Sequence, residues 1–214
     1  MKTSLGIDAG DVLLQKKINI GRDETAGELF ERLSELGAAA LTEALPQIEN
    51  GTAIFKKQEE SLATYTKMIK KEDAELDFSE TAERIVNKIR AYEPAPASYT
   101  FLNGEPFKIH KAEKAYGYSA PTDGKTGVFL KTDSELVVSA ADGAVRLLVV
   151  QRAGGKAMDI SAFLRGSKLN AGDRFTHSQS LLHENTPHEI RQNDNAPREN
   201  TLRENPRHDE KQSK

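Results

Sequence analysis

Apolar and polar positions divide the first fifty residues into an extended segment and a helix. Residues 11–20, DVLLQKKINI, are apolar at both ends and polar in the middle, which predicts a strand. Thr25, with Glu28 three residues later, forms a capping-box pattern that predicts the start of a helix. The residues at helical spacing that we expect to form one buried stripe are Leu29, Leu33, Leu36, Ala40 and Leu41.

The end of this first unit is marked by turn residues. We expect Pro46 to disrupt the last turn of the helix, and Asn50-Gly51 to end the unit. One strand and one helix are too few for a domain. Residues 1–51 therefore resemble the end of a larger α/β layer.

The sequence after residue 51 has the pattern of a linker followed by a short helix. Residues 52–78 lack sustained periodicity and are rich in Lys and Glu, so we interpret them as a linker crossing a surface. Ser79 is a suitable N-cap for a helix through Ala91, which Pro94 and Pro96 stop. The residues of this helix that we expect to face inward are Ala82, Ile85, Val86 and Ile89.

Turn signals predict a set of short strands in the second half of the chain. Residues 98–102 and 106–110 flank Asn103-Gly104, and residues 135–140 and 144–150 flank Asp142-Gly143, so both pairs read as hairpins. Asp123-Gly124 marks another turn, and residues 159–165 read as a short helix ending at Gly166. One helix followed by about five short strands suggests a small OB-like β-barrel over residues 79–175. The fold class is therefore α+β, and the barrel alone assigns no function.

Residues 176–214 have the composition of a disordered tail. From position 177 onward only five residues are apolar, namely Leu181, Leu182, Ile190, Ala196 and Leu202. Such a segment cannot bury enough apolar surface to offset its ordering entropy. The tail also holds His177, His183, His188 and His208, whose irregular spacing favours solvated chain over a weak metal site.

Composition narrows the possible chemistry. The 214 residues contain no cysteine, which excludes disulfides, thiolate zinc sites and thiol catalysis. No apolar run approaches the ~18 residues of a membrane span, and the N-terminus lacks the apolar core of a signal peptide. We therefore expect a cytoplasmic protein without a membrane partner.

Charge is unevenly distributed, although the formal net charge is only −3. Residues 1–83 carry 10 basic and 17 acidic residues, whereas residues 84–175 carry 14 basic and 9 acidic, a net charge of +5. A basic segment of domain size is a known indication of a nucleic-acid face. The alternative is an ordinary domain with solvated lysines.

The glycine-rich stretch Gly6 to Asp11, GIDAGD, is the densest candidate site. Its glycines allow the backbone to approach a ligand, and Asp8 has the chemistry to orient a protonated base or relay a proton. The alternative is a turn whose aspartates bond their own backbone.

Five stretches, in order, are similar to the 10-formyltetrahydrofolate-dependent formyltransferases, and most of all to those that act on methionyl-tRNA. They are GIDAGDVLL, LPQIENGTA, TYTKMIKKEDAELDF, IRAYEPAPAS and QRAGGKAMDISAFLRG. The resemblance runs from about residue 1 to 175. Within it, Ile7 and Ala9 stand where the family has Leu and Thr, and Ala95 replaces the usual Trp.

The resemblance implies a fold, an activity and a limit to that activity. Residues 1–51 would be the C-terminal remnant of a Rossmann-like catalytic domain, followed by the linker and a tRNA-binding barrel. The family transfers a formyl group from 10-formyltetrahydrofolate to the amine of initiator methionyl-tRNA, using an Asn, a His and an Asp together. Asp8 matches that Asp, and Asp8 and Gly10 match the cofactor loop, but the Asn and His have no match here. His110 reads as a barrel surface residue.

We therefore expect an inactive C-terminal fragment of such an enzyme, with a missing or separately encoded N-terminal half as a partner. The chain alone should bind the folate co-substrate poorly, and we expect no metal. The residues that the resemblance favours for tRNA contact are Lys67, Lys70, Lys71, Arg90, Lys156, Arg165 and Lys168. The alternatives are a sugar-nucleotide formyltransferase, a formyltetrahydrofolate hydrolase, or a stand-alone RNA-binding module without catalysis.

Overall fold

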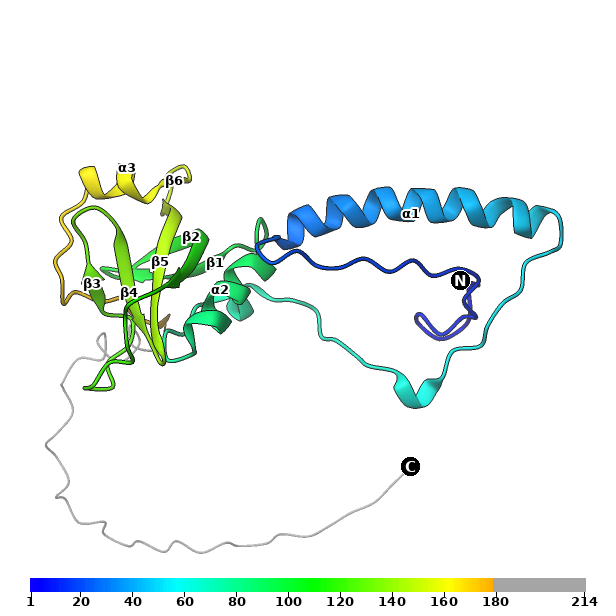
Figure 1. Cartoon of the computed structure of the whole chain (residues 1–214), viewed down its shortest axis with the longest axis horizontal. Helices are drawn as coiled ribbons and strands as arrows, with labels where there is room; N and C mark the ends of the chain where they lie inside the picture. Colours follow the sequence, from blue (N-terminus) through cyan, green and yellow to red (C-terminus); the bar gives the residue numbers. More distant parts are fainter. Residues whose placement is uncertain (179–214) are drawn as a thin grey trace, which may run out of the picture.

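The computed structural model describes residues 1–178, and the expected tail from residue 179 onward lies outside the described residues. A long helix runs away from a small sheet (Figure 1). The helices are α1 (Ala26–Glu49), η1 (Glu60–Leu62), η2 (Lys71–Ala74), α2 (Ala82–Ala91) and α3 (Ile160–Arg165). The strands are β1 (Ser98–Leu102), β2 (Glu105–Ala115), β3 (Phe129–Lys131), β4 (Leu136–Ala140), β5 (Gly143–Arg152) and β6 (Met158–Asp159).

The strands form one antiparallel sheet in the order β1-β2-β5-β4-β3, with β6 paired to β5. The hairpin between β1 and β2 turns at Asn103 and Gly104, whose φ angles are 53° and 79°. Positive φ at both turn residues is what the Asn-Gly pair favours, so this expectation is confirmed. The mixed α and β character of the chain is confirmed as well.

The hairpin between β4 and β5 turns one residue earlier than expected. Ala140 pairs with Gly143, so the two turn residues are Ala141 and Asp142 rather than Asp142 and Gly143. The Asp142 carboxylate bonds outside this turn: it accepts a hydrogen bond from the backbone N–H of Ala82 at 2.7 Å. The turn therefore helps to hold the start of α2.

Helix α2 begins at a different cap from the one expected. Thr81, not Ser79, is the N-cap, and its side chain accepts a hydrogen bond from the N–H of Arg84. Ser79 instead donates its N–H to the Asp77 carboxylate, in a turn before the helix. The predicted inward face is confirmed, since Ala82, Ile85 and Ile89 are buried and Val86 packs against the core at partial exposure.

Residues 172–178, which we call the closing segment, join the two edges of the sheet. On one side Phe175 donates its N–H to the Gly127 carbonyl, just before β3, and Phe129 of β3 donates to the Asp173 carbonyl. On the other side Thr176 and Phe101 of β1 exchange two backbone hydrogen bonds, at 3.0 and 3.2 Å. The sheet thus has no open edge along these residues.

The Phe175 ring lies at the centre of the aromatic part of the core. It is stacked on Phe78 at 5.4 Å and lies 4.8 Å from Phe129 and 5.5 Å from Phe107, all measured between ring centroids. Leu76 and Phe78 come from the segment that reads as a linker, yet both belong to this buried cluster. The core therefore begins before residue 79, within the segment that reads as a linker.

The end of the closing segment is held by a carboxylate. Glu75 accepts hydrogen bonds from the backbone N–H and the hydroxyl of Ser178, at 2.8 and 2.7 Å, and lies 3.2 Å from His177 Nδ1. Burial raises the pKa of Glu75, but the bonds from Ser178 and His177 outweigh burial and lower it below its ordinary value. His177 and Ser178 thus lie against the sheet domain, although their composition resembles that of the tail.

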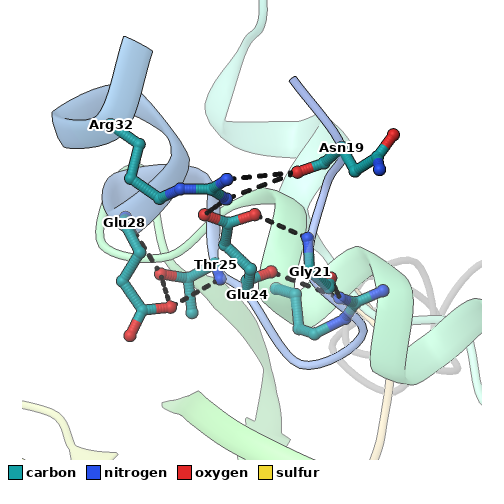
Figure 2. A network of polar contacts seen from close by, with 7 residues as sticks. Asn19, Gly21, Glu24, Thr25, Glu28 and Arg32 are labelled. Atoms are coloured by element: carbon teal, nitrogen blue, oxygen red, sulfur yellow. Dashed lines mark hydrogen bonds and ion pairs between the residues drawn. The ribbon is translucent and has the colours of Figure 1, made fainter. Parts of the chain in front are cut away.

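Helix α1 has the expected start, shown in Figure 2. Thr25 accepts a hydrogen bond from the Glu28 N–H and Glu28 accepts one from the Thr25 N–H, so the capping box is present. In the same network Glu24 accepts hydrogen bonds from Arg32 and from the N–H of Gly21. Asn50 ends the helix, followed by Gly51 with φ 69°.

Three expectations about the N-terminal region are wrong. No residue of α1 is buried, and Leu33 and Leu41 of the predicted stripe are 42% and 59% exposed, because nothing in the described chain covers that side of the helix. Pro46 lies inside the helix. Because proline has no N–H, the carbonyl four residues earlier loses its helical hydrogen bond, but the helix is exposed and this carbonyl can bond water instead. Residues 11–20 are extended but form only one bridge, Val12 with Lys56, because no longer strand lies beside them.

We expect Phe175→Ala to lower the free energy of unfolding of the sheet domain by about 3–5 kcal/mol, the usual cost of removing a buried aromatic ring. Phe30→Ala is the matched control, because Phe30 is 74% exposed on α1 and such a change should cost less than about 0.5 kcal/mol. Urea unfolding followed by circular dichroism measures both. Equal effects of the two substitutions would contradict a core role for the closing segment.

The Glu75 contacts predict an acid-sensitive closing segment. Because the pKa of Glu75 is lowered in the folded protein, its contribution is complete above the ordinary value of 4.5 and is lost as the pH falls through the lowered value. Glu75→Gln should therefore flatten the fall in stability with decreasing pH in that range, as measured by urea unfolding between pH 6 and 3. An unchanged acid-side slope would show that Glu75 does not hold the segment.

Candidate functional site

Asp8 lies in a tight loop near the N-terminus. Its φ is 52°, in the left-handed region that is uncommon for residues other than glycine, and its side chain is exposed. Gly10, two residues later, is buried. A Cβ on Gly10 would lie 1.7 Å from the carbonyl oxygen of Lys2, so no other residue fits there.

The start of the linker holds this loop. Val12 and Lys56 exchange two backbone hydrogen bonds, at 2.8 and 2.9 Å, and Lys2 donates its N–H to the Asp11 carbonyl at 2.9 Å. The Lys2 ammonium lies over the Phe55 ring at 4.2 Å. Gln58 donates from its side-chain amide to the carbonyls of Asp8 and Gly10. Gln58 is not among the residues expected from the sequence, because nothing in the local pattern around it marks a contact fifty residues back along the chain.

Among the described residues, the Asp8 loop contains no histidine. His110 lies on β2, where its ring nitrogens are each 2.9 Å from an acceptor, Oε2 of Glu93 and Oε1 of Gln151. Gln151 in turn donates to the Gly155 carbonyl at 2.7 Å. His110 thus joins the turn after α2 to β2, β5 and the β5–β6 connection, and its side chain is only 16% exposed.

Of the three linker lysines, Lys67 and Lys70 lie between η1 and η2, and Lys71 is the first residue of η2. Lys67, Lys70 and Lys71 are exposed, and the Lys71 ammonium lies 6.0 Å from the centre of the Tyr99 ring. Tyr65 precedes these lysines in the sequence and Met68 lies among them, and each is 87% exposed. Lysines close to an exposed aromatic ring are typical of surfaces that bind unpaired nucleotides.

Arg90 is engaged within the chain. Its guanidinium donates to the carbonyls of Gly21, Arg22 and Glu24 and to the Asn87 side chain. Next to it, Gly27 of α1 donates its N–H to the Glu93 carbonyl at 3.0 Å. These contacts fix the start of α1 against the end of α2, so most of the donors of Arg90 are already used.

The remaining predicted cations lie around one end of the sheet domain. Lys156 is in the β5–β6 turn, Arg165 is in the last turn of α3, and Lys168 follows α3; all three are exposed. Lys168 lines a cavity of about 350 Å³ between the β1–β2 hairpin, the end of β5 and α3. Its apolar wall includes Leu102, Phe107 and Phe163.

A second cation in this cavity, Arg152, was missed by the sequence analysis. The Arg152 guanidinium lies 4.7 Å from the centre of the Phe163 ring and donates to the Ser167 hydroxyl. Its side chain remains exposed although these contacts support it. The available signal was a cation two residues after the apolar run of β5. The charged residues that line the cavity are thus two cations, Arg152 and Lys168, and one carboxylate, Glu105.

Residues 1–178 hold no helix with the length and apolar character that crossing a membrane requires. Within the same residues, no group of three or more His, Cys, Asp or Glu side chains is arranged to hold a metal ion.

Comparison with known sequences identifies close relatives. Residues 68–168 match the family described as formyl transferase, C-terminal domain. The methionyl-tRNA formyltransferase of Syntrophus aciditrophicus is 44% identical over 168 residues, which are 78% of this chain and 53% of the relative. That of Geobacter metallireducens is 35% identical over 181 residues, or 83% of this chain and 56% of the relative. The chain thus spans about half the length of the curated relatives it matches.

Comparison with solved structures shows the same fold. HypX from Aquifex aeolicus, in complex with tetrahydrofolic acid, matches 81% of this chain and 32% of its own, with a TM-score of 0.56 and 19% identity. The N-formyltransferase of Helicobacter canadensis, in complex with folinic acid and dTDP-3-aminofucose, matches 66% of this chain and 51% of its own, with a TM-score of 0.51 and 23% identity. Residues 68–168 thus match the formyl transferase C-terminal domain, and over about four fifths of its length the chain is similar to methionyl-tRNA formyltransferases.

Proposed function

We propose that this chain serves formylation of initiator methionyl-tRNA in the cytoplasm, and that its sheet domain and linker bind the tRNA. The observation that carries the proposal is that two cations, Arg152 and Lys168, line the cavity at one end of the sheet domain. Lys156 and Arg165 stand on the elements that border it. The names of the relatives give the substrate, since those proteins are methionyl-tRNA formyltransferases.

The charges of the chain support binding through phosphates. Residues 84–175 carry a net charge of +5, and Lys56, Lys57, Lys67, Lys70 and Lys71 extend the basic surface along the linker. Each cation that reaches a phosphate releases a counterion and adds a salt-sensitive contribution that does not depend on base sequence. Arg90 contributes to this surface mainly as a positioning residue, because its donors hold the start of α1.

The proposal includes the architecture of the three parts of the chain, namely the N-terminal region, the linker and the sheet domain. We interpret residues 79–175, together with the closing segment, as an OB-like barrel, because backbone hydrogen bonds join β1 and β3 through residues 172–176. Barrels of this kind expose loops that bind oligonucleotides. We interpret residues 1–51 as part of a Rossmann-like catalytic domain and residues 52–78 as the linker.

The catalytic contribution of the chain would be the Asp8 carboxylate. In formyl transfer an amine attacks the formyl carbon of 10-formyltetrahydrofolate, and a tetrahedral intermediate must have its oxyanion held and a proton moved. An exposed carboxylate in a fixed loop can orient a protonated base for that step. In this loop the exposed side chain of Asp8 is accessible to a folate, whereas Gly10 is buried against the Lys2 carbonyl.

A stand-alone RNA-binding module is the second candidate function. It is favoured by one observation, namely that the predicted cations are exposed on the linker and sheet domain while Asp8 has no histidine beside it among residues 1–178. The two candidates share the tRNA surface and differ only in whether Asp8 takes part in catalysis.

We expect the 214-residue chain alone to produce no formyl-methionine from 10-formyltetrahydrofolate and charged initiator tRNA. Groups that act as a catalytic unit are strongly non-additive, so one aspartate gives no useful rate. The measurement is product analysis after incubation at high protein concentration. Turnover above background that disappears in Asp8→Ala, but persists in Asp11→Ala, would show that the chain is itself a catalyst.

We expect the tRNA affinity of the chain to fall steeply with salt, by on the order of tenfold for every one or two phosphate contacts per tenfold rise in salt. Reversal of Lys67, Lys156 and Lys168 to Glu should weaken binding to any tRNA alike and lower the salt slope by about three. Fluorescence anisotropy with labelled tRNA measures both quantities.

The matched control reverses Lys111, Lys114 and Lys125, which are also exposed on the sheet domain and change the net charge equally. These lysines lie on β2 and in the turn at 123–125, away from the residues that line the cavity. The control triple should keep most of the affinity. Equal losses from the two triples would mean that net charge, and not this surface, binds the tRNA.

A further inference from the structure

The side chain of Gln58 makes two hydrogen bonds to the backbone of the Asp8 loop. Its Nε2 lies 2.8 Å from the carbonyl oxygen of Asp8 and 2.7 Å from that of Gly10. A primary amide has two N–H donors on one nitrogen, so a single side chain can satisfy both carbonyls. The contact joins two segments that lie about fifty residues apart in the sequence.

The position of these two carbonyls explains why the contact has consequences for Asp8. They belong to the residues on either side of Ala9, so holding both restrains the peptide plane between Asp8 and Ala9 and the plane between Gly10 and Asp11. Asp8 itself has a φ of 52°. A non-glycine residue in the left-handed region keeps that conformation only where its surroundings impose it.

The other contacts of the loop do not replace the amide. Lys2 with Asp11 and Val12 with Lys56 pair at the base of the loop, through backbone atoms. The turn of the loop, from Asp8 to Gly10, is held from outside by Gln58. Gln58 also stands in the linker, before Lys67, Lys70 and Lys71.

We propose that Gln58 is a positioning residue for Asp8: its side-chain amide, by holding the Asp8 and Gly10 carbonyls, fixes the loop and with it the direction of the Asp8 carboxylate. What Asp8 then does rests on the proposed function, but the restraint itself does not.

The test is amide hydrogen exchange on the full 214-residue chain, followed by NMR. The reporters are the backbone amides of Lys2, Val12 and Lys56, all of which donate hydrogen bonds at the base of the loop. In Gln58→Met, which keeps the length of the side chain and removes the donors, we expect these amides to exchange about tenfold faster, as for the loss of a hydrogen bond of ordinary net strength. Gln58→Glu should act in the same direction, because a carboxylate accepts but does not donate.

Two further variants separate hydrogen bonding from packing. Gln58→Lys keeps N–H donors at the end of an unbranched side chain, so it should retain a measurable part of the protection. Gln47→Glu is the matched control, because Gln47 donates its amide to the Glu43 carbonyl within α1, and the same chemical change there should leave the loop unaffected. A spectroscopic signature accompanies the effect: the side-chain amide protons of Gln58 should be protected from exchange in the parent chain.

The outcomes are distinct. If Gln58→Met exchanges like the parent chain, or if Gln47→Glu speeds the reporters as much as Gln58→Glu does, the proposal is overturned. If Gln58→Lys is no better than Gln58→Met, side-chain donors at this position are not what holds the loop, and the proposal fails as well. Because no RNA is present, failure of the tRNA-binding experiment leaves this result unchanged, and the two proposals are tested separately.

Discussion

The sheet domain depends on the insertion of Phe175 between its two edges. The backbone around this residue pairs with the segments next to β3 on one side and with β1 on the other, while its ring contacts Phe78, Phe107 and Phe129. An unpaired sheet edge is a site for association with other chains, and the closing segment covers both edges at once. The same closure supports the cavity, because Phe107 forms part of the cavity wall and packs on Phe175.

The N-terminal region is organised in a different way. It has no buried helix face of its own, and it is held by polar contacts: the Thr25–Glu28 capping box, the Glu24–Arg32 pair and the four hydrogen bonds of Arg90. Exposed apolar residues such as Phe30 and Leu45 lie along α1, and further ones lie in the linker. A helix of this composition is usually stabilised by packing of its apolar face. The region thus contributes an exposed apolar surface, whereas the sheet domain contributes the core.

Local signals in the sequence predicted local structure well, and contacts between distant segments account for most of what they missed. The capping box at Thr25 and the Asn103-Gly104 turn depend on a few adjacent residues, and both are as expected. Burial of Leu33 and Leu41 and the strand at 11–20 depend on partners elsewhere in the chain, which periodicity cannot reveal. In the site, clusters of lysine and the Asp8 loop were visible from composition and motif. Arg152 and Gln58 were not singled out, because the role of each depends on a contact with another element, across 15 residues for Arg152 and Ser167 and about 50 for Gln58 and the loop.

The long helix α1 contacts the end of α2 only near its own first residues, so a small rotation at this junction moves its far end by a large distance. Helix α1 has 24 residues, so it extends about 36 Å from its first residue. Its attachment consists of the Gly27–Glu93 hydrogen bond, close contact of Gly27 with Pro94, and the bonds of Arg90. A rotation of only about ten degrees at this junction would move the far end of the helix by roughly 6 Å, given its length. Small changes in the side chains around Gly27 would thus be amplified into displacements as large as a turn of helix.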